Sequence, residues 1–493
     1  MAAAKAGSSL ALHYRRYAIG NVLTLVAGLI TFPITTRLLT NEQFGLLGYW
    51  EAWIVLLVAV FKLGAGDTIM RFYPSRDDPQ LLVRHATNFV LVPTLLGLAG
   101  WGTCLVVASL GAVLGLVETP WVMLVALGIV LVNVLTSHVL WVMRTRQLSG
   151  LGTVIDVSAR WLGVGATLIT LFYVSQSVIG MLVARMAAGA IILALLISWT
   201  FRNLRFSWAA VDMPYAREGL AYGIPLALKE LSGVVLAFVD RIMLRWLLGD
   251  LGALGIYVIG SSLATYVDQL VTSALGQAWT PAVNRVYNTE GADAVRALKA
   301  RVLRPLVYVC AGLAIGIVVG GQDLVVLVAG AGKAAAAPIF VLSSVLLLVT
   351  PVLTIGGTGL LLERKSKTYF ALTLVAAGIN IVANLALIPV FGIFGAAIST
   401  SCSQIVLYSL FYGFCPPALR CLPRPKVIFT AGVGVVAFLA LHLVVEQMSL
   451  VQPWARLLIL IPTMLLGYVV PVLAMDPEMR AMALALRRRR EGA

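Results

Sequence analysis

Long apolar segments separated by short polar ones run through the whole chain. We predict fourteen of them as membrane-crossing helices, because a helix needs about 20 predominantly apolar residues to cross a bilayer. A transmembrane barrel would instead show segments of about ten residues with alternating polarity, whereas these runs are continuous. The pattern therefore predicts an all-α polytopic membrane protein. The segments are approximately 17–39, 43–64, 86–111, 119–142, 150–173, 177–200, 219–248, 253–278, 304–321, 335–361, 369–389, 391–414, 426–445 and 454–474.

One segment, Gly219–Trp246, is charged although it is mostly apolar and long enough to cross with tilt. Its five charged residues are Lys229, Glu230, Asp240, Arg241 and Arg245. Each charge at membrane depth costs roughly 2.5–3.5 kcal/mol on insertion scales, so the charged side of this helix must face protein or a water-filled cavity. Two explanations stay open. The charges line a transport cavity, or they form structural pairs at 229/230 and 240/241 while Arg245 reaches the headgroups.

Composition and charge placement agree with a membrane protein. Hydrophobic residues make up 60% of the 493 residues and charged residues 12%, against about 25% charged residues in a soluble domain. The net charge of +15 does not indicate a nucleic-acid partner, because Lys and Arg cluster at alternate ends of the apolar segments. The opposite ends carry only Lys333 and Arg456. By the positive-inside rule, both termini are predicted to be cytoplasmic.

Other function classes lack their sequence signals. The five cysteines are scattered without a CxxC pair, so we expect no metal or redox site. There is no phosphate-binding P-loop and no Gly-rich Rossmann turn, so we expect no nucleotide cofactor. The N-terminus leads directly into a full-length span, and no cleavable signal is apparent. The predicted outer loops are too short to hold the acceptor of a membrane polymerase or ligase, so we expect a protein that is not an enzyme.

A weak internal repeat predicts the domain organisation. Residues 37–49 read RLLTNEQFGLLGY and residues 245–257 read RWLLGDLGALGIY, so an Arg, a tight turn and a Gly-containing stretch recur. Two parallel repeats of six spans follow, the arrangement in which transporters place a site between lobes. We expect an N-terminal lobe over 1–205, a C-terminal lobe over 206–418, two extra spans over 419–475 and a basic cytoplasmic tail over 476–493. Chance similarity is the alternative, because Arg-turn-Gly is common at span ends.

Several stretches in order resemble one known family. The chain resembles the polysaccharide-transport branch, which includes the Wzx-type flippases, of the multidrug/oligosaccharidyl-lipid/polysaccharide exporter superfamily. The likeness covers essentially the whole chain and is more specific for the fold than for the substrate. It is carried by Asn21–Arg37 with Phe44-Gly45, by Gly64–Phe72, by Phe238–Arg241 with Leu254–Tyr257, by Gln277–Pro281 and by Asn384–Ala397.

This resemblance implies a function. It implies a flippase of the bacterial inner membrane that moves polyprenyl-pyrophosphate-linked oligosaccharides by alternating access, for surface or exopolysaccharide biosynthesis such as that of O-antigen. It also implies coupling to H⁺ or Na⁺ without a bound cofactor. The implied partners are the lipid-linked glycan, membrane lipids and, as further partners, a polysaccharide polymerase and glycosyltransferases, with no nucleic acid.

A pyrophosphate headgroup needs cations, and arginine suits this because it stays charged and donates two parallel hydrogen bonds. The candidate cavity residues are Arg37, Glu51, Arg160, Lys229, Glu230, Asp240, Arg241 and Arg245. Two alternatives stay open: Arg160 forms a local ion pair with Asp156 one turn earlier, and Arg185 serves packing. Asp268, which has no basic neighbour three or four residues away, is the candidate for cation or proton coupling.

Three rival functions remain. The same fold could carry the peptidoglycan lipid precursor or small cationic drugs by cation antiport. A protein of another class would be a membrane polymerase or ligase of polysaccharide assembly. A third possibility is a scaffold that docks glycosyltransferases on the basic loop Arg285–Arg304.

Two further segments have a local interpretation. In Asn384–Ala397 we expect Pro389 to end a helix, Gly392 to make the turn and Gly395 to allow close packing. The tail from Pro477 to Arg490 could form a basic amphipathic helix on the anionic leaflet, or it is an ordinary stop-transfer cluster.

Overall fold

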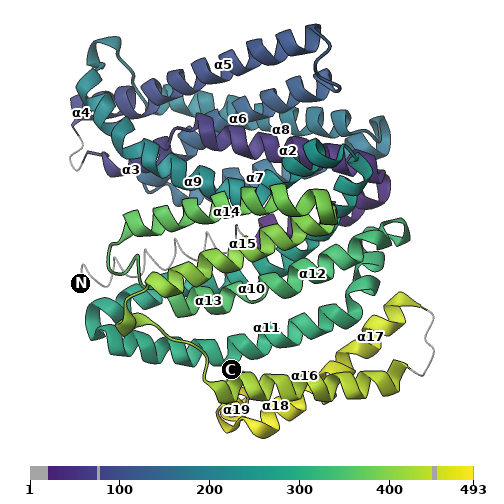
Figure 1. The fold of residues 1–493 in the computed structure, drawn as a ribbon. Coiled ribbons are helices and arrows are strands. Elements are labelled where there is room, and N and C mark those ends of the chain that lie inside the picture. Colours follow the sequence, from purple (N-terminus) through teal and green to yellow (C-terminus); the bar gives the residue numbers. More distant parts are fainter. Residues whose placement is uncertain (1–19, 21, 75–77, 447–451, 492–493) are drawn as a thin grey trace. The chain divides into compact units, whose positions relative to one another are not determined.

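The computed structural model describes residues 20, 22–74, 78–446 and 452–491, and the regular structure within these ranges is helical, with no strand assigned. This confirms the all-α prediction. The chain divides into two compact units, residues 1–246 with 250–255, and residues 247–249 with 256–493. Figure 1 colours the first unit purple to teal and the second teal to yellow. The division rests on packing alone, so the six-span lobes expected at 1–205 and 206–418 stay a prediction.

The first unit begins, in its described part, with an apolar helix over Val22–Leu38. The elements that follow are α2 (Asn41–Phe61), α3 (Ala65–Arg71), α4 (Pro79–Ala86), the π-helical turn η1 (Thr87–Leu91), α5 (Val92–Val113), α6 (Pro120–Thr145), α7 (Ser149–Ile169), the π-helical turn η2 (Thr170–Val174), α8 (Val178–Asn203), the 3₁₀ turn η3 (Trp208–Ala210) and α9 (Met213–Leu248).

The second unit takes over within α10 (Leu251–Glu290), whose first residues belong to the first unit. It continues with α11 (Ala292–Ala329), η4 (Ala331–Ala336), α12 (Ala337–Leu347), α13 (Thr350–Gly357), α14 (Ser366–Phe391), α15 (Ile393–Phe414), η5 (Pro417–Leu419), α16 (Pro425–Glu446), α17 (Pro453–Met464), the π-helical turn η6 (Leu465–Val469), α18 (Val470–Met475) and α19 (Pro477–Glu491).

Twelve segments in the described ranges are long and apolar enough to cross a membrane. Two expected spans are not among them. The helix Val22–Leu38 is apolar but short, and the expected first span begins outside the described residues. The other is α9, which carries the charged stretch noted above. The chain is therefore a multi-pass membrane protein, while the count of fourteen stays a prediction.

The basic stretch Arg285–Arg304 is helical, not the loop that we expected. Helix α10 runs to Glu290 and α11 begins at Ala292. Between them Gly291 has a φ of +85°, a conformation that favours glycine, so a single residue makes the corner. With 40 and 38 residues, α10 and α11 exceed the roughly 20 needed to cross a bilayer, so their charged ends extend beyond it. The apolar pattern marked only the part inside the membrane.

In the first unit, the start of α9 packs closely on α3. Leu63 and Gly64 both have positive φ and separate α2 from α3. A Cβ on Gly64 would lie 2.1 Å from the carbonyl oxygen of Gly223, so the two backbones touch there. Thr68 Oγ1 donates to the carbonyl oxygen of Gly219 at 3.2 Å. These contacts fix the first half of α9 against α3 within the first unit.

In the second unit, the last two spans pack on α11. Tyr308 and Ile315 of α11 form a buried cluster with Phe438 of α16, Tyr468 of η6 and Val472 of α18. Tyr468 Oη donates to the carbonyl oxygen of Tyr308 at 2.7 Å, which ties the last span to α11. Figure 1 shows α16, α17 and α18 together beside α11.

The link between α14 and α15 corrects one local expectation and confirms two. Helix α14 contains Pro389 and continues to Phe391, so the proline does not end it. Gly392 makes the turn with a φ of +57°. A Cβ on Gly395 would lie 2.2 Å from the carbonyl oxygen of Leu387, so the close approach expected there is present.

One lysine of the basic stretch is fully buried. Lys299 Nζ donates to the carbonyl oxygens of Gly356 at 3.0 Å, Thr358 at 2.5 Å and Leu419 at 2.6 Å. It therefore joins α11 to the end of α13 and to η5.

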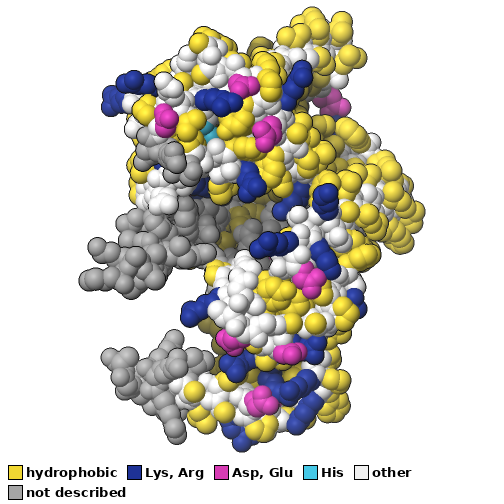
Figure 2. Space-filling model, turned by 90° about the vertical axis from the view of Figure 1, so that its left-hand side faces the viewer, with side chains coloured by type: hydrophobic (Ala, Val, Ile, Leu, Met, Phe, Trp, Pro, Cys, Tyr) yellow, Lys and Arg dark blue, Asp and Glu magenta, His cyan; other side chains and the backbone are white. Residues whose placement is uncertain are grey.

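Figure 2 looks onto the helix ends that the sequence assigns to the cytoplasm, where many Lys and Arg side chains are exposed.

Candidate functional site

The charged stretch lies in one helix, as predicted. Helix α9 spans 36 residues with Pro225 inside it. The five charges of the predicted segment form two groups, residues 229–230 and residues 240–245, separated along the axis by about 15 Å at 1.5 Å per residue. Within the first unit, each group meets a different set of neighbours.

The first group belongs to a cluster of four charges. Lys62, at the end of α2, forms an ion pair with Glu230. Asp67 of α3 interacts electrostatically with Lys229, Glu230 and Lys62. Lys229 and Glu230 are exposed, and 19% of the Lys62 side chain is exposed. We call these four residues the Lys62 cluster; its two positive and two negative charges are accessible at the surface of the unit.

The sequence analysis missed half of this cluster. Lys62 and Asp67 were not among the candidates, although both lie at the end of an apolar segment and the rule that selected Lys229 and Glu230 applies to them. A buried histidine, His138, lies next to the cluster. It is 2% exposed and its Nδ1 lies 2.8 Å from Thr94 Oγ1. Its Nε2 lies 3.4 Å from the carbonyl oxygen of Lys62, which helps to position that residue.

The second group lies where the loop between α5 and α6 meets α2 and α9. Arg245 forms an ion pair with Glu118 of the loop between α5 and α6. The indole N–H of Trp50 donates to Thr119 Oγ1 at 3.3 Å in the same loop. The rings of Trp53 and Trp246 lie 6.2 Å apart. Arg245 therefore ties α9 to the loop between α5 and α6.

Asp240 and Arg241 are buried, with 2% and 9% of their surface exposed. The backbone N–H of Arg241 donates to Asp240 Oδ1 at 2.7 Å, and the Arg241 guanidinium lies 5.0 Å from the centre of the Phe238 ring. A cation held over an aromatic ring is stabilised without full hydration. This pair could therefore keep its charge inside the protein.

The candidates on other helices are placed differently. Arg185 of α8 forms an ion pair with Glu51 of α2 at 2.7 Å, with about a third of each side chain exposed. Arg37 is exposed near the end of the helix Val22–Leu38. The structure therefore brings the candidate Glu51 together with Arg185. A packing role was the alternative that we left open for Arg185.

The ion pair between Arg160 and Asp156 is not formed. Asp156 instead accepts a hydrogen bond from Arg144 Nη2 at 3.3 Å. Arg144 is the last but one residue of α6 and α7 begins five residues after it, so the tight connection brings Arg144 to the first turns of α7. Arg160 is exposed on α7. A tertiary neighbour has replaced the local one, and Arg160 stays a candidate.

Asp268 lies in the second unit, on α10, and is partly buried. Thr272 Oγ1 lies 3.4 Å from its Oδ2. Its Oδ1 is buried and has no hydrogen-bond partner among the described residues. Such an oxygen can accept a proton or contact a cation. The coupling role stays a prediction.

A buried cluster of polar side chains lies between α14 and α15, and we did not predict it from the sequence. Asn384 Nδ2 donates to Asn380 Oδ1 at 3.2 Å, and Asn380 Nδ2 donates to Thr400 Oγ1 at 3.3 Å. Ser399 Oγ donates to the carbonyl oxygen of Asn380 at 3.1 Å. Asn384 Oδ1 has no partner in the described part of the chain. Two asparagines four residues apart in an apolar helix would have been the signal.

Solved structures share this fold. The lipid II flippase MurJ in an inward closed conformation superposes with a TM-score of 0.69 at 12% identity, over 94% of this chain and 99% of that one. An inward-facing multidrug transporter of the MATE family and MOP superfamily gives a TM-score of 0.61 at 15% identity, over 79% and 92%. A MOP superfamily transporter from Pyrococcus furiosus, described as having a binding pocket of reverse polarity, gives a TM-score of 0.55 at 14% identity, over 81% of this chain and 94% of that one.

A search of curated protein sequences finds no significant match. The shared fold is that of flippases and transporters, in agreement with the expectation that the chain is not an enzyme. The family described as "Polysaccharide biosynthesis protein" matches residues 16–286, which is more than half of the chain. The chain therefore belongs to the polysaccharide biosynthesis protein family and has the fold of the exporter superfamily to which its sequence bears a resemblance.

Proposed function

We propose that the protein is a flippase that moves polyprenyl-pyrophosphate-linked oligosaccharides across the bacterial inner membrane by alternating access. The observation that carries the proposal is a charged membrane helix, α9, in a chain of the polysaccharide biosynthesis family. A fold shared with a lipid II flippase supports transport of a lipid-linked headgroup.

The chemistry of the substrate fits the accessible cations. A pyrophosphate carries negative charge that must stay out of hydrocarbon, and it binds where Lys or Arg can donate to its oxygens. Lys229 in the Lys62 cluster and Arg160 on α7 are exposed in the first unit. Arg241 is held over the Phe238 ring. We assign the headgroup to these residues, with sugar hydroxyls meeting Glu230 and its neighbours.

Coupling to an ion completes the proposed cycle. Moving a charged headgroup against its gradient needs a driving force, and a carboxylate that binds H⁺ or Na⁺ in one conformation supplies it. Asp268, with a buried oxygen that has no partner in the described residues, is our candidate. A polysaccharide polymerase and glycosyltransferases would act after and before the flippase, and we propose them as functional partners.

Complementation tests the proposal. The chromosomal gene is deleted, and Lys229→Ala, Arg241→Ala and Arg160→Ala are expressed beside the wild type and beside Arg285→Ala, an exposed arginine of α10 outside the candidate set. Membrane levels are matched by immunoblot. Surface polysaccharide is measured by gel, and lipid-linked intermediates are quantified on the cytoplasmic side.

The proposal expects the deletion to lose surface polymer and to accumulate inward-facing intermediate. At least one of the three variants should share this defect, while Arg285→Ala restores the polymer. Normal polysaccharide in the deletion strain, with no other flippase present, would contradict it. Accumulation of the peptidoglycan lipid precursor in the deletion strain would indicate that the protein transports this precursor instead. A change in drug sensitivity alone would indicate that it transports small drugs.

A further inference from the structure

A basic pocket lies in the second unit, and none of its lining residues is among the candidates for transport. It has a volume of about 250 Å³ and is formed where the first turns of α11, the segment before α16 and the first turns of α19 meet. The side chains used below are Arg301, Arg304, Leu422, Arg424 and Glu478. We call it the α11–α19 pocket.

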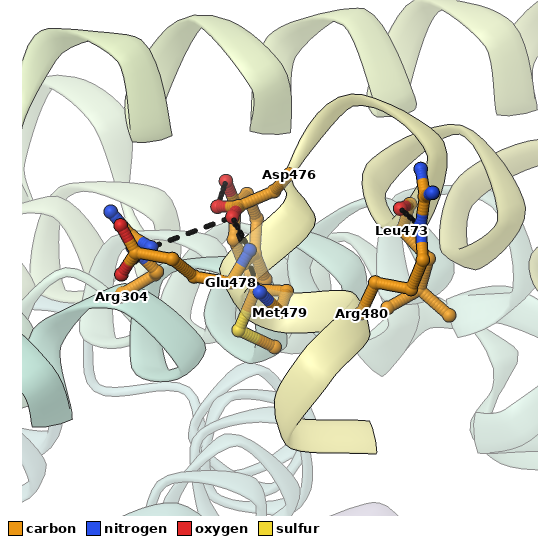
Figure 3. Close-up of polar contacts among 7 residues, drawn as sticks. Arg304, Leu473, Asp476, Glu478, Met479 and Arg480 are labelled. Carbon is orange, nitrogen blue, oxygen red and sulfur yellow. Dashed lines mark hydrogen bonds and ion pairs between the residues drawn. The ribbon is translucent and has the colours of Figure 1, made fainter. Parts of the chain in front are cut away.

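The connection between α18 and α19 builds one wall of this pocket. Asp476 Oδ2 accepts a hydrogen bond from Tyr308 Oη at 2.8 Å, and its Oδ1 accepts from the backbone N–H groups of Glu478 at 3.1 Å and Met479 at 3.2 Å. Arg480 donates to the carbonyl oxygens of Leu473 at 3.0 Å and Ala474 at 2.7 Å. Figure 3 shows Asp476 beside Glu478 and Met479, and Arg480 beside Leu473, at the corner between the helices. The start of α19 is therefore held firmly against α11.

Three arginines lie around the pocket, and two of them have no carboxylate partner among the described side chains. Arg304 is 13% exposed and forms ion pairs with Asp476, at 3.5 Å, and with Glu478. Arg301 and Arg424 are exposed and have no ion pair among the described side chains. Glu478, with 68% of its side chain exposed, lies in the wall as the carboxylate that a bound anion would displace. Three guanidinium groups around one small cavity suit a phosphate group.

The position of the pocket indicates where this phosphate comes from. Arg304 is the thirteenth residue of the 38-residue α11, and about 20 residues suffice to cross a bilayer, so the pocket lies near the membrane boundary. The sequence assigns this boundary to the cytoplasm. Next to the pocket, Leu422 is 51% exposed, and Ile428 and Phe429 of the membrane helix α16 are 56% and 66% exposed. Acyl chains could cover these residues while the headgroup enters the pocket.

We infer that the α11–α19 pocket binds the phosphate group of an anionic phospholipid from the cytoplasmic leaflet. A free phosphate would use the same arginines but not the apolar surface of α16, which is why we assign the lipid. The inference does not depend on the transported substrate. The C-terminal helix, held by Asp476, would then sense the lipid composition of the membrane.

The test uses the full chain, purified in a neutral detergent without phosphate. Dioctanoyl phosphatidylglycerol, dioctanoyl phosphatidylcholine and sodium phosphate are titrated separately, and bound species are quantified by native mass spectrometry. The variants are Arg301→Gln with Arg424→Gln, and Glu478→Gln. The matched control is Arg202→Gln with Arg205→Gln, two exposed arginines assigned to the same side of the membrane in the first unit.

We expect phosphatidylglycerol to bind more tightly than phosphatidylcholine. The Arg301/Arg424 double variant should lose about 25-fold in affinity for phosphatidylglycerol, about fivefold for each charge near the surface. The control should change less than twofold. Glu478→Gln should bind phosphatidylglycerol about two- to fivefold more tightly, because it removes the competing carboxylate. This gain keeps the test decisive if the double variant fails to fold.

Three results would overturn the inference. An equal loss in the control pair would show that overall charge, not the pocket, attracts the lipid. No gain, or a loss, in Glu478→Gln would show that the anion does not approach Arg304. Phosphate alone binding as tightly as phosphatidylglycerol would remove the lipid as its source.

Discussion

At the scale of single residues, Lys299 shows that a charge in a membrane protein can serve structure. Its ammonium group donates to three backbone carbonyl oxygens and is fully buried. Lys299→Met would leave these oxygens without their donor, and each unsatisfied buried group costs about 1–3 kcal/mol. We expect the variant to lose roughly 3 kcal/mol or more of stability and about 5 °C or more in Tm, measured by thermal unfolding in detergent.

Lys367→Met is the matched control for this prediction. Lys367 is also a lysine of the predicted cytoplasmic side, but it is exposed near the start of α14. Its replacement should change Tm by no more than a degree or two, since surface substitutions are usually within about 0.5 kcal/mol. Equal Tm values for the two variants would show that the carbonyl oxygens find water when Lys299 is removed.

At the scale of elements, the starts of α2 and α10 cross at two glycines. A Cβ on Gly45 would lie 2.0 Å from the carbonyl oxygen of Leu251, and a Cβ on Gly255 would lie 1.9 Å from that of Asn41. Asn41 precedes Gly45 by four residues, and Leu251 precedes Gly255 by four, so the contact is reciprocal. The backbones of the two helices therefore touch at this crossing, whereas the repeat expected from these segments stays a prediction.

Alanine at either glycine tests this crossing. Gly45→Ala or Gly255→Ala must push the two backbones apart by about 1 Å, because real Cβ atoms essentially never lie under 3.0 Å from a neighbouring atom. We expect a lower Tm and a population shift away from this conformation, read from spin-label distances between the starts of α2 and α10. Gly413→Ala in α15 has open space around its Cβ and should behave as wild type. Unchanged distances in Gly255→Ala would mean that the crossing is loose.

The corner before α19 makes a pH-dependent prediction. Burial raises the pKa of Asp476, but the hydrogen bonds from Tyr308 and from the backbone N–H groups of Met479 and Glu478, together with the charge of Arg304, outweigh it, so the pKa lies below 3.8. A carboxyl with a depressed folded pKa stabilises the fold above its unfolded pKa of about 3.9, and this contribution disappears as the pH falls through the folded value.

Hydrogen exchange of residues 477–485 is the measurement for this corner. After correction for intrinsic exchange rates, protection should be constant from pH 7 to about pH 5 and should decrease below about pH 4. Asp476→Asn should show low protection throughout, with little dependence on pH. The transmembrane helix α16 serves as the internal reference. Full pH dependence in Asp476→Asn would assign the effect to another group.

At the scale of the whole molecule, the apolar pattern was sufficient for the fold class but not for helix ends. Insertion into a bilayer selects apolar runs, so most spans could be read directly, and α9 is one helix as predicted. The apolar pattern predicts a loop over Arg285–Arg304, whereas the structure has helices there, because hydropathy does not report a helix that continues into water. Glycine at positive φ, as at Gly392, could be recognised from its local sequence.

The pairing of charges could not be predicted from the sequence in the same way. Asp156 bonds Arg144 rather than Arg160, and Glu230 bonds Lys62 rather than a neighbour in α9. These partners come from helices whose relative rotation is set by packing, and hydropathy carries no information on rotation. Unusual charges such as Lys229 and Glu230 could be identified from the sequence, whereas their partners, Lys62 among them, required the structure.

The proposed energy coupling would belong to the whole molecule, because one bound ion would have to change the equilibrium between two conformations. A ligand shifts such an equilibrium only by its difference in affinity for the two states. A carboxylate with a buried oxygen that has no described partner, such as Asp268, gains a contact when a proton or cation arrives, so its affinity depends on the conformation around it. Asp268→Asn should therefore abolish transport without lowering the amount of protein in the membrane.

We expect Asp268→Asn to reach the membrane and fold as the wild type does, with a Tm within a few degrees, yet to fail in complementation. Purified wild-type protein should release or take up one proton, or bind one ²²Na⁺, per molecule on a change of pH or Na⁺ concentration, and Asp268→Asn should not. Asp268→Glu, which keeps the charge, should retain ion binding at altered affinity. Asp293→Asn, at an acidic residue in the first turn of α11, is the control and should keep both activities. Full complementation by Asp268→Asn would show that the driving ion binds elsewhere, because a neutral amide cannot exchange a proton with the solvent in each transport cycle.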